Sequence, residues 1–482
     1  MTKYICQLTP QLKSQNSCPP HVVLFPFMSK GHTIPLLHFA RILLHRRDTA
    51  VTVFTTPANR PFIAESLNGT AATIITLPFP ENIASDIPNG IESTDKLPSI
   101  CLFCKFAMAT EAMQPHFEEA LKTLPRVSFM VTDGFLWWTL ESATKFSVPR
   151  FVYFGMNCYS LCLSMEAMKA GIFSGSQPDD ELVTLTRFPW IRLSKEDFDP
   201  AFRNREPDSL ENVFNMKSIS STLNSSGILV NSFYELEPKF VDYLNTESSP
   251  KNWCIGPLCL SEQTPKIYSE SDMKPTWVRW LDQKSCSVLY VAFGSQAEIS
   301  QEQIKEIAIG LEESMVNFLW VVRKDDEWGG LPDGFEERVK GRGMVVREWV
   351  DQREILMHES VEGFLSHCGW NSVLESICAG VPILAWPMMA EQPLNARMVV
   401  DEIKVGLRVE TSNGSVKGFV KWEGVRNKVR ELMEEEKGRE ARKKVRELAQ
   451  MAKVAVQEGG SSWSTLHSLL QETCFKKEKS PV

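Results

Sequence analysis

The sequence predicts an α/β protein with two doubly wound, Rossmann-like domains that face each other across a cleft. Three observations predict this class. Short apolar runs alternate with longer helical patterns, the runs fall into two series, and a polar stretch separates the two series. A chain of 482 residues is long enough for two or three domains.

The first series of expected strands lies in the N-terminal half. Aromatic and β-branched residues dominate six runs, at 21–27, 51–56, 73–79, 128–134, 150–155 and 227–233. Runs without polar alternation indicate strands that are covered on both faces, as in a parallel sheet between helices. We therefore expect an N-terminal domain over residues 1–255.

The second series follows a polar, proline-containing stretch at 256–276, "GPLCLSEQTPKIYSESDMKPT", which we interpret as a linker. Its runs lie at 287–295, 318–323, 344–350, 363–369, 382–387 and 406–410. The charged 3.6-residue pattern over 421–456 predicts helices with solvated outer faces. We expect a C-terminal domain over 277–459 and a last helix over about 460–482, capped by Ser461 or Ser462.

Composition excludes several classes of protein. Apolar residues make up 43% and charged residues 23%, as in globular proteins, and a net charge of −8 argues against a nucleic-acid binder. The first twenty residues lack the apolar core of a secretory signal, and no run reaches the roughly 18 apolar residues of a membrane span. Twelve scattered cysteines indicate reduced core thiols. We predict a cytoplasmic protein without a transmembrane segment.

Three polar clusters follow expected strands, at residues 30–32, 132–134 and 367–369. Ligands of open α/β sheets bind beyond the carboxyl ends of the strands. Neutral His32 can accept a proton near neutral pH, and Asp133 ends another expected strand. Taken alone, His32 also fits an ordinary loop histidine, and Asp133 fits a turn or cap residue.

The third cluster lies in "GFLSHCGWNSVLESICAGVP", residues 363–382. Adjacent His367 and Cys368 point to opposite faces of a strand, which disfavours a zinc site and a nucleophile pair. A glycine followed by exposed helix-start amides favours an anion such as phosphate, although a packing turn has the same residues. Ser372 and Glu375 also fit a capping box.

The surrounding 44 residues, "WVDQREILMHESVEGFLSHCGWNSVLESICAGVPILAWPMMAEQ", closely resemble the donor-binding signature of plant family 1 UDP-sugar glycosyltransferases. The matching positions are Trp349, Gln352, His358, His367 through Ser372, Glu375, Trp386, Glu391 and Gln392. The resemblance extends from "FPFMSKGHTIPLL" to "EGGSSWSTLHSLL". Asp351 departs from the family, which usually has proline there.

This resemblance implies a GT-B fold, with the acceptor in the N-terminal domain, the UDP-sugar in the C-terminal domain and a last helix that crosses back. It implies that His32 is the catalytic base and that Asp133 orients it. The donor residues that it implies are Trp349 on uracil, Val350 and Gln352 at the nucleoside, Glu375 at the ribose, Ser295, His367, Gly369, Asn371 and Ser372 at the diphosphate, and Trp370, Trp386, Glu391 and Gln392 at or near the sugar.

The expected reaction is inverting transfer of glucose from UDP-glucose to a hydroxyl of a flavonoid, phenolic or terpenoid, by a monomer without a metal. Formation of a glucose ester and an inactive UDP-sugar-binding protein are alternatives. An oxidoreductase is disfavoured because no GxGxxG follows a strand. Asp197 and Asp199 match an Asp-x-Asp metal pattern, but their polar surroundings favour a solvated loop or helix start. Several aromatic or apolar residues fit either an acceptor pocket or the core: Phe27, Trp137, Trp138, Phe154, Met156, Phe188 and Trp190.

Overall fold

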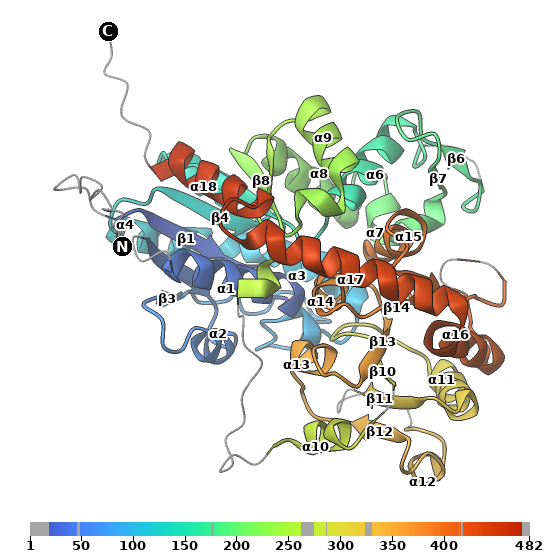
Figure 1. The fold of residues 1–482 in the computed structure, drawn as a ribbon. Coiled ribbons are helices and arrows are strands. Elements are labelled where there is room, and N and C mark those ends of the chain that lie inside the picture. The colour runs from blue at the N-terminus through green and yellow to red at the C-terminus, as the bar shows by residue number, and fades with distance from the viewer. Residues whose placement is uncertain are drawn as a thin grey trace, which may run out of the picture.

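Two parallel sheets form the centres of the two halves of this computed structural model (Figure 1). The described residues are 19–45, 49–174, 178–261, 274–285, 287–322, 330–413, 415 and 418–474. The middle of the predicted linker, 262–273, and the end of the predicted last helix, 475–482, lie outside the described residues.

The sheet of the N-terminal half has the strand order β3-β2-β1-β4-β5-β8-β9, and all its neighbouring strands are parallel. Each predicted run forms a strand: β1 His21–Phe25, β2 Ala50–Thr55, β3 Thr73–Thr76, β4 Phe129–Asp133, β5 Arg150–Tyr153 and β8 Gly227–Val230. Three short strands were not predicted: β9 Asn252–Cys254, and the antiparallel pair β6 Val183–Thr184 and β7 Arg192–Leu193.

The sheet of the C-terminal half has the order β12-β11-β10-β13-β14-β15 and is also parallel throughout. Its strands confirm the second predicted series: β10 Val288–Ala292, β11 Asn317–Val321, β12 Gly343–Val346, β13 Val361–Ser366, β14 Ile383–Ala385 and β15 Gly406–Arg408.

Helices cover both sheets and connect their strands. The α-helices of the N-terminal half are α1 Lys30–His45, α2 Arg60–Ser66, α3 Phe103–Ala109, α4 Gln114–Thr123, α5 Thr139–Lys145, α6 Cys158–Lys169, α7 Pro200–Arg203, α8 Leu210–Leu223 and α9 Pro238–Glu247. Those that follow are α10 Thr276–Asp282, α11 Gln301–Ser314, α12 Phe335–Arg338, α13 Gln352–Leu356, α14 Trp370–Ala379, α15 Gln392–Arg397, α16 Trp422–Glu434, α17 Glu436–Val456 and α18 Ser461–Cys474. Shorter turns are η1 Thr94–Lys96, η2 Ile100–Leu102, η3 Thr110–Met113, η4 Lys195–Asp197, η5 Tyr234–Leu236, η6 Leu258–Ser261 and η7 Met398–Glu402.

Alternate side chains of the central strands enter cores on opposite faces of each sheet. In β1, Val22 and Leu24 join one buried cluster, while Val23 and Phe25 join another. A further cluster is shared by the two halves: it contains Tyr159 from α6 together with Trp370 from α14. Because burial of apolar surface is a main driving force of association, this shared core holds the two halves together.

Each sheet changes its direction of winding beside its first strand, since β1 lies between β2 and β4 and β10 lies between β11 and β13. Ligands of doubly wound sheets bind at such switch points, beyond the carboxyl ends of the strands. The loops that follow β1, β4, β10 and β13 are therefore the places where a site is expected. Three of the four carry the polar clusters noted in the sequence.

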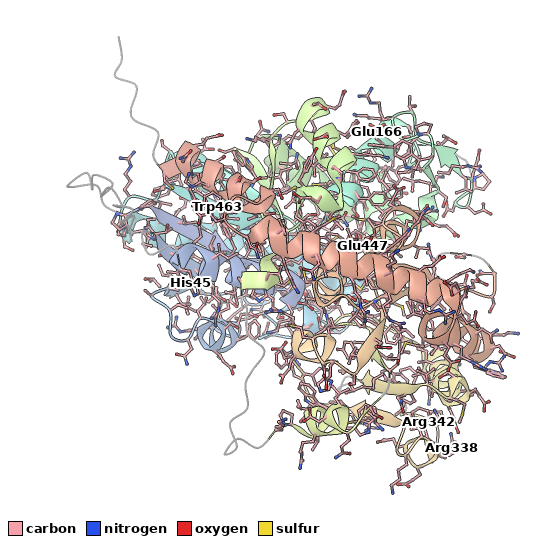
Figure 2. All side chains as sticks on the ribbon, in the orientation of Figure 1. His45, Glu166, Arg338, Arg342, Glu447 and Trp463 are labelled. Atoms are coloured by element: carbon pink, nitrogen blue, oxygen red, sulfur yellow. The ribbon has the colours of Figure 1, made fainter. Side chains whose placement is uncertain are left out.

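The chain returns to its N-terminal half at the end. Figure 1 shows α17 running from α16 to α18, and α18 packs on the first sheet through Leu466 and Leu469. Figure 2 labels Glu447 on α17 and Trp463 on α18, where the Trp463 ring stacks on His467. The predicted caps Ser461 and Ser462 instead donate to Glu235 and to the Gly256 carbonyl, which ties α18 to the N-terminal half.

Among the described residues, no helix is long and apolar enough to cross a membrane.

Candidate active site

His32 and Asp133 meet at the switch point of the first sheet. His32 lies in the first turn of α1, and Asp133 ends β4. The Nδ1 atom of His32 lies 2.6 Å from Oδ2 of Asp133. The His32 side chain is 18% exposed whereas Asp133 is fully buried, so only the imidazole of this pair can reach a substrate. This geometry suits a base that is held by an orienting carboxylate.

Asp133 is itself fixed by the backbone and by a buried arginine. Its Oδ1 accepts a hydrogen bond from the Phe135 N–H at 3.0 Å. Arg150, which is 1% exposed, donates to the Asp133 carbonyl at 3.3 Å and to the Thr132 hydroxyl at 2.7 Å. The guanidinium thereby holds the strand end and places a positive charge near the carboxylate. Arg150 was not among the predicted site residues, although a basic residue that opens an apolar run is a signal for such a role.

The environment of His32 favours its protonated form. Burial by itself lowers the pKa of His32, but the charge of Asp133 and the hydrogen bond to it outweigh burial, with a further contribution from Glu391. The pKa of His32 therefore stands above its ordinary value. An imidazole with this preference readily accepts a proton from a substrate hydroxyl.

Aromatic rings lie close to His32. The ring of Phe27 lies 6.0 Å from that of His32, and the ring of Phe135 lies 5.1 Å from it, centroid to centroid. Phe103 and Phe154 pack on Phe135 at 5.2 and 5.9 Å. Phe27 and Phe154 were predicted, whereas Phe103 and Phe135 were not. The position of Phe135 two residues after Asp133 was the available signal.

The other predicted aromatic residues have different contacts. Trp137 is buried, and Trp138 is buried with its indole N–H donating to Thr110 at 3.1 Å. Phe188 packs on Phe240 at 5.1 Å. Trp190 is 52% exposed and donates to Glu402 in the C-terminal half at 3.1 Å. Met156 is half-buried. The core interpretation therefore holds for the two tryptophans at 137 and 138, for Phe188 and for Phe27, which is also fully buried.

Trp349 is the most exposed aromatic side chain among the large hydrophobic residues of the described chain, at 75%. It follows β12, close to the carboxyl edge of the second sheet. A large exposed indole at a strand end is suited to stacking on a flat ligand. Its neighbour Val350 is buried in a core cluster with Trp277 and Ile355. The side chain of Val350, a residue predicted to lie at the nucleoside, is therefore part of the core.

Asp351 replaces the family's usual proline without loss of the turn. Its carboxylate accepts hydrogen bonds from the N–H groups of Arg353 at 3.1 Å and Glu354 at 3.4 Å, and so caps α13. Its φ of −76° is one that proline also adopts. The cap starts the helix at the residue predicted to bind the nucleoside. His358, at the other end of this segment, lies 3.2 Å from Asp282.

Gln352 joins two predicted donor residues. Its Nε2 donates to the Ser372 hydroxyl at 2.8 Å and to the Glu375 carboxylate at 2.7 Å. Burial raises the pKa of Glu375 to about 7, against the opposing effect of the Gln352 bond. Gly369, and not Ser372, occupies the N-cap of α14, so the capping-box interpretation of Ser372 and Glu375 is wrong. Both side chains instead face Gln352, where ribose hydroxyls can bind.

His367 lies where the loops after β10 and β13 meet. A Cβ atom added to Gly294 would lie 2.7 Å from its Nε2 atom, and one added to Gly369 would lie 2.6 Å from it. Gly294 also has a φ of +76°, which glycine tolerates best. Burial lowers the pKa of His367 to about 4, so the ring is neutral at pH 7. Exposed Ser295 follows on the same loop as Gly294.

The start of α14 is bonded to the N-terminal half. Asn371 donates from Nδ2 to the carbonyl of Gly31, the neighbour of His32, at 2.6 Å. The Trp370 indole is 2% exposed and donates to the Asn231 carbonyl at 2.7 Å. The N-terminus of α14, whose first amides have no acceptor within the helix, is thus held beside the segment that carries His32.

Trp370 and Trp386, which are predicted to lie at or near the sugar, both have buried indoles. Trp386 is 6% exposed and its ring packs 5.6 Å from that of Phe293. Both indoles are core side chains because large apolar rings gain most from full burial. Only backbone atoms of the two residues remain to contact a ligand.

Glu391 and Gln392 lie at the start of α15. Glu391 accepts a hydrogen bond from Asn395 at 3.2 Å, and burial raises its pKa. Its charge also helps to raise the pKa of His32. The Gln392 side-chain oxygen accepts from the N–H groups of Met388 and Met389, both at 3.0 Å. These bonds fix the turn that precedes α15.

Asp197 and Asp199 are not a solvated loop. Asp197 is fully buried and its carboxylate binds Arg397, while Asp199 caps α7. The helix-start interpretation therefore holds, and the solvated one is wrong. Within the described ranges, no group of three or more His, Cys, Asp or Glu residues is arranged to hold a metal ion.

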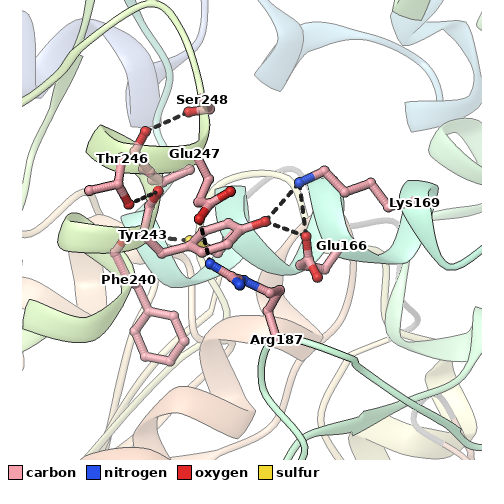
Figure 3. A network of polar contacts seen from close by, with 10 residues as sticks. Glu166, Lys169, Arg187, Phe240, Tyr243, Thr246, Glu247 and Ser248 are labelled. Atoms are coloured by element: carbon pink, nitrogen blue, oxygen red, sulfur yellow. Dashed lines mark hydrogen bonds and ion pairs between the residues drawn. The ribbon is translucent and has the colours of Figure 1, made fainter.

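Two surface hollows lie elsewhere. One of about 680 Å3 lies beside α17 and Glu362, at the opposite end of β13 from His367. The other, of about 280 Å3, lies between α6 and α9. Polar side chains that bond to one another line it, and Figure 3 shows the Tyr243 hydroxyl between Glu166 and Lys169. Neither contains a residue of the His32 site.

Comparison with known proteins agrees with this geometry. Residues 281–446 match the family model of UDP-glucoronosyl and UDP-glucosyl transferases. UDP-glycosyltransferase 90A1 of Arabidopsis thaliana is 58% identical over 95% of this chain and 97% of its own length. UDP-glucose flavonoid 3-O-glucosyltransferase 7 of Fragaria ananassa is 34% identical over 94% and 96%.

The chain belongs to plant family 1 of the UDP-glycosyltransferases.

Solved structures of this family have the same fold. Phytolacca americana UGT2, complexed with UDP-2fluoro-glucose and pterostilbene, aligns with a TM-score of 0.79 and 31% identity over 94% of this chain and 99% of its own. Glycyrrhiza uralensis UGT73P12, complexed with glycyrrhetinic acid 3-O-monoglucuronide, aligns with a TM-score of 0.83 and 30% identity over 94% and 96%. The fold is therefore GT-B, and the enzyme glycosylates small acceptors from a UDP-sugar, as the sequence predicted.

Proposed function

We propose that this glycosyltransferase moves glucose from UDP-glucose to a hydroxyl of a small apolar or phenolic acceptor, with inversion at the anomeric carbon. One observation supports the proposal: the His32–Asp133 pair lies opposite the N-terminus of α14. Asn371, in the first turn of α14, donates a hydrogen bond from Nδ2 to the carbonyl of Gly31, the neighbour of His32, at 2.6 Å. A proton acceptor and an anion-binding helix start are thus held face to face.

In the proposed step, Nε2 of His32 takes the proton of the acceptor hydroxyl. The acceptor oxygen attacks the anomeric carbon, and the bond from that carbon to the diphosphate oxygen breaks. The α-linked donor gives a β-glucoside, and the negative charge passes to the departing UDP. Neutral His367 and the amides at the start of α14 stabilise that charge. Asp133 stabilises the imidazolium.

The donor is proposed to lie along the predicted motif. Trp349 stacks on uracil, and Gln352 and Glu375 bind the nucleoside, supported by their mutual hydrogen bond at 2.7 Å. Ser295, Gly369 and Ser372 complete the diphosphate site, and Glu391 and Gln392 bind the sugar. The reaction as proposed uses no metal, because His367 and the helix amides meet the charge of the leaving group.

The aromatic rings around His32 support an acceptor with a flat or apolar body, such as a flavonoid, a phenolic or a terpenoid. We place the acceptor in a domain of residues 1–255 with the helix of about 460–482 crossing back, and the donor in residues 277–459 beyond a linker of 256–276. Since one chain supplies every assigned residue, a monomer suffices. The free cysteines suit a reducing compartment, the cytoplasm.

The test is turnover of UDP-glucose with a panel of phenolic, flavonoid and terpenoid acceptors, followed by UDP release, product mass and the anomeric coupling in the proton NMR spectrum. A β-linked glucoside on oxygen is expected. An α-linked product would contradict inversion through direct attack by the acceptor. UDP binding without transfer to any acceptor would favour the inactive-binder alternative, and products only on carboxylic acids would favour ester formation.

A further inference from the structure

The six-residue helix α15 carries the proposed sugar contacts, yet much of its support comes from the other half of the chain. Glu391 immediately precedes α15 and Gln392 opens it. The segment of residues 194–203 in the N-terminal half reaches both ends of this helix. Its Asp197 and Asp199 are the Asp-x-Asp pair to which the sequence analysis gave no role.

Asp197 holds the last residue of α15. Its carboxylate accepts two hydrogen bonds from Arg397, from Nε at 2.6 Å and from an Nη nitrogen at 3.1 Å. The Ser194 N–H donates to the same carboxylate at 2.9 Å. Asp197 is fully buried. A buried, two-pronged carboxylate–guanidinium pair has little freedom, so it fixes the position of α15 relative to the N-terminal half.

Asp199 holds the turn that leads into α15. One carboxylate oxygen accepts from the Ala201 N–H at 3.0 Å and so caps α7, while the other accepts from the Ala390 N–H, also at 3.0 Å. Ala390 has a φ of +50°, an uncommon conformation for a residue with a side chain. The Asp199 bond helps to maintain this backbone directly before Glu391.

Asn395 in the middle of α15 is held from α6. Its Oδ1 accepts hydrogen bonds from Nδ2 of Asn157 and from the Ser160 hydroxyl, both at 3.0 Å. Its own Nδ2 donates to the Glu391 carboxylate at 3.2 Å. The Glu391 carboxylate, which is proposed to bind the sugar, is therefore linked to the N-terminal half through the side chain of Asn395 alone.

We propose that Asp197 and Asp199 are positioning residues for the donor sugar. They set the place of Glu391 and Gln392 from the acceptor-binding half of the enzyme, without touching the donor themselves. The inference rests on the proposed function, since it requires the sugar to lie at Glu391 and Gln392. Binding of the nucleotide part of the donor, which is proposed to lie around Trp349, should not depend on the contacts of Asp197 and Asp199 with α15.

The test replaces Asp199 by serine. Serine keeps a hydroxyl that can cap α7, but its single short side chain cannot also hold Ala390. Calorimetry without acceptor should show UDP-glucose binding weakened about three- to tenfold, with UDP binding unchanged within about twofold, as expected for loss of one hydrogen bond at the sugar end. The preference for UDP-glucose over UDP-galactose in kcat/KM should fall by a similar factor.

Two further variants complete the design. Asp179→Ser is the matched control, because Asp179 is an exposed carboxylate that binds Arg203 of the same segment, and it should bind both ligands like wild type. Replacing Asp197→Leu together with Arg397→Met removes the ion pair as a unit, so no buried charge is left alone. This double variant should reproduce the selective weakening of UDP-glucose binding.

Gln392→Ala separates the two ways in which the reasoning can fail. If Gln392→Ala weakens UDP-glucose binding and Asp199→Ser does not, Asp199 does not position the sugar site, while the assignment of Gln392 to that site stands. If Gln392→Ala also binds UDP-glucose like wild type, the sugar site itself is misassigned. Equal weakening of UDP and UDP-glucose by Asp199→Ser would show a general structural role and overturn the inference.

Discussion

Replacing Asp133 by asparagine should remove most activity on hydroxyl acceptors while the enzyme still binds UDP. The substitution keeps the size of the side chain and can keep the bond from the Phe135 N–H. It removes the negative charge that lies 2.6 Å from Nδ1 of His32. The base then has no carboxylate to stabilise its protonated form as the acceptor proton arrives.

The magnitude follows from that contact. A hydrogen bond to a charged group contributes about 1.5–3 kcal/mol, which corresponds to about 10- to 150-fold in rate if it is felt fully in the transition state. The asparagine amide can also donate to Nδ1, which moves the ring proton to Nε2 and blocks the base. We therefore expect kcat on an alcohol acceptor to fall between about 10² and 10⁴-fold.

The pH dependence should shift as well. His32 acts as a base only when neutral, and its pKa in the wild type is raised, so activity should increase as the pH rises through that value. In Asp133→Asn the lowering effect of burial is no longer outweighed, so the acidic limb should move to lower pH. The ratio of wild-type to variant rates should therefore be smaller at acidic pH than at pH 8.

The assay is single-turnover transfer to an aliphatic alcohol, which does not ionise in this range, with UDP affinity as the check on folding. His32→Ala should lose as much activity, and the double variant should be little worse, because Asp133 acts through His32. Rates of Asp133→Asn and wild type within a few-fold of each other, with chemistry rate-limiting and an unmoved pH profile, would refute the role of the pair.

Other parts of the site give three further predictions. Trp349→Ala should weaken UDP binding by about ten- to a hundredfold, since stacking on a base contributes about 1–3 kcal/mol, and calorimetry on the folded variant measures it. Wild-type enzyme should use UDP-glucose better than UDP-galactose because of Gln392, and competing-donor assays that favour galactose would contradict this. Gly294→Ala should lower UDP affinity and turnover, because its Cβ would displace His367. Gly171→Ala is the control, because Gly171 has a φ of +68° but a Cβ atom added there would have no other atom within 4 Å, so this variant carries backbone strain alone. If Gly294→Ala and Gly171→Ala lowered UDP affinity and turnover equally, the contact with His367 would not be the cause.

The fold could be predicted because its strands are continuous apolar runs. Each run between Val22 and Leu407 that was identified by composition forms a strand of a parallel sheet. Strand β9, which pairs with β8 at the edge of its sheet, was missed because it opens with the polar Asn252 and gives no continuous apolar run. The cap that Asp351 forms on α13 was not predicted, because the sequence marked this residue only as a departure from the family's proline.

The site was predictable where its residues follow strand ends, and not where it depends on distant pairs. His32 and Asp133 come together because adjacent parallel strands end at one edge. Asp197 was interpreted as solvated because its sequence neighbours are polar, but its partner Arg397 lies 200 residues away. Local composition carries no information about such a partner, and only the assembled domains show that the carboxylate is buried.

The bond from Asn371 to Gly31 uses a side chain on one domain and a main-chain carbonyl on the other, as does the bond from Trp370 to Asn231. Any N-terminal half with the same backbone offers these carbonyls, whatever its side chains. Hybrid enzymes that exchange whole halves between relatives should therefore keep this part of the junction intact. The Asp197–Arg397 pair uses side chains on both halves, so a functional hybrid must carry both members or neither.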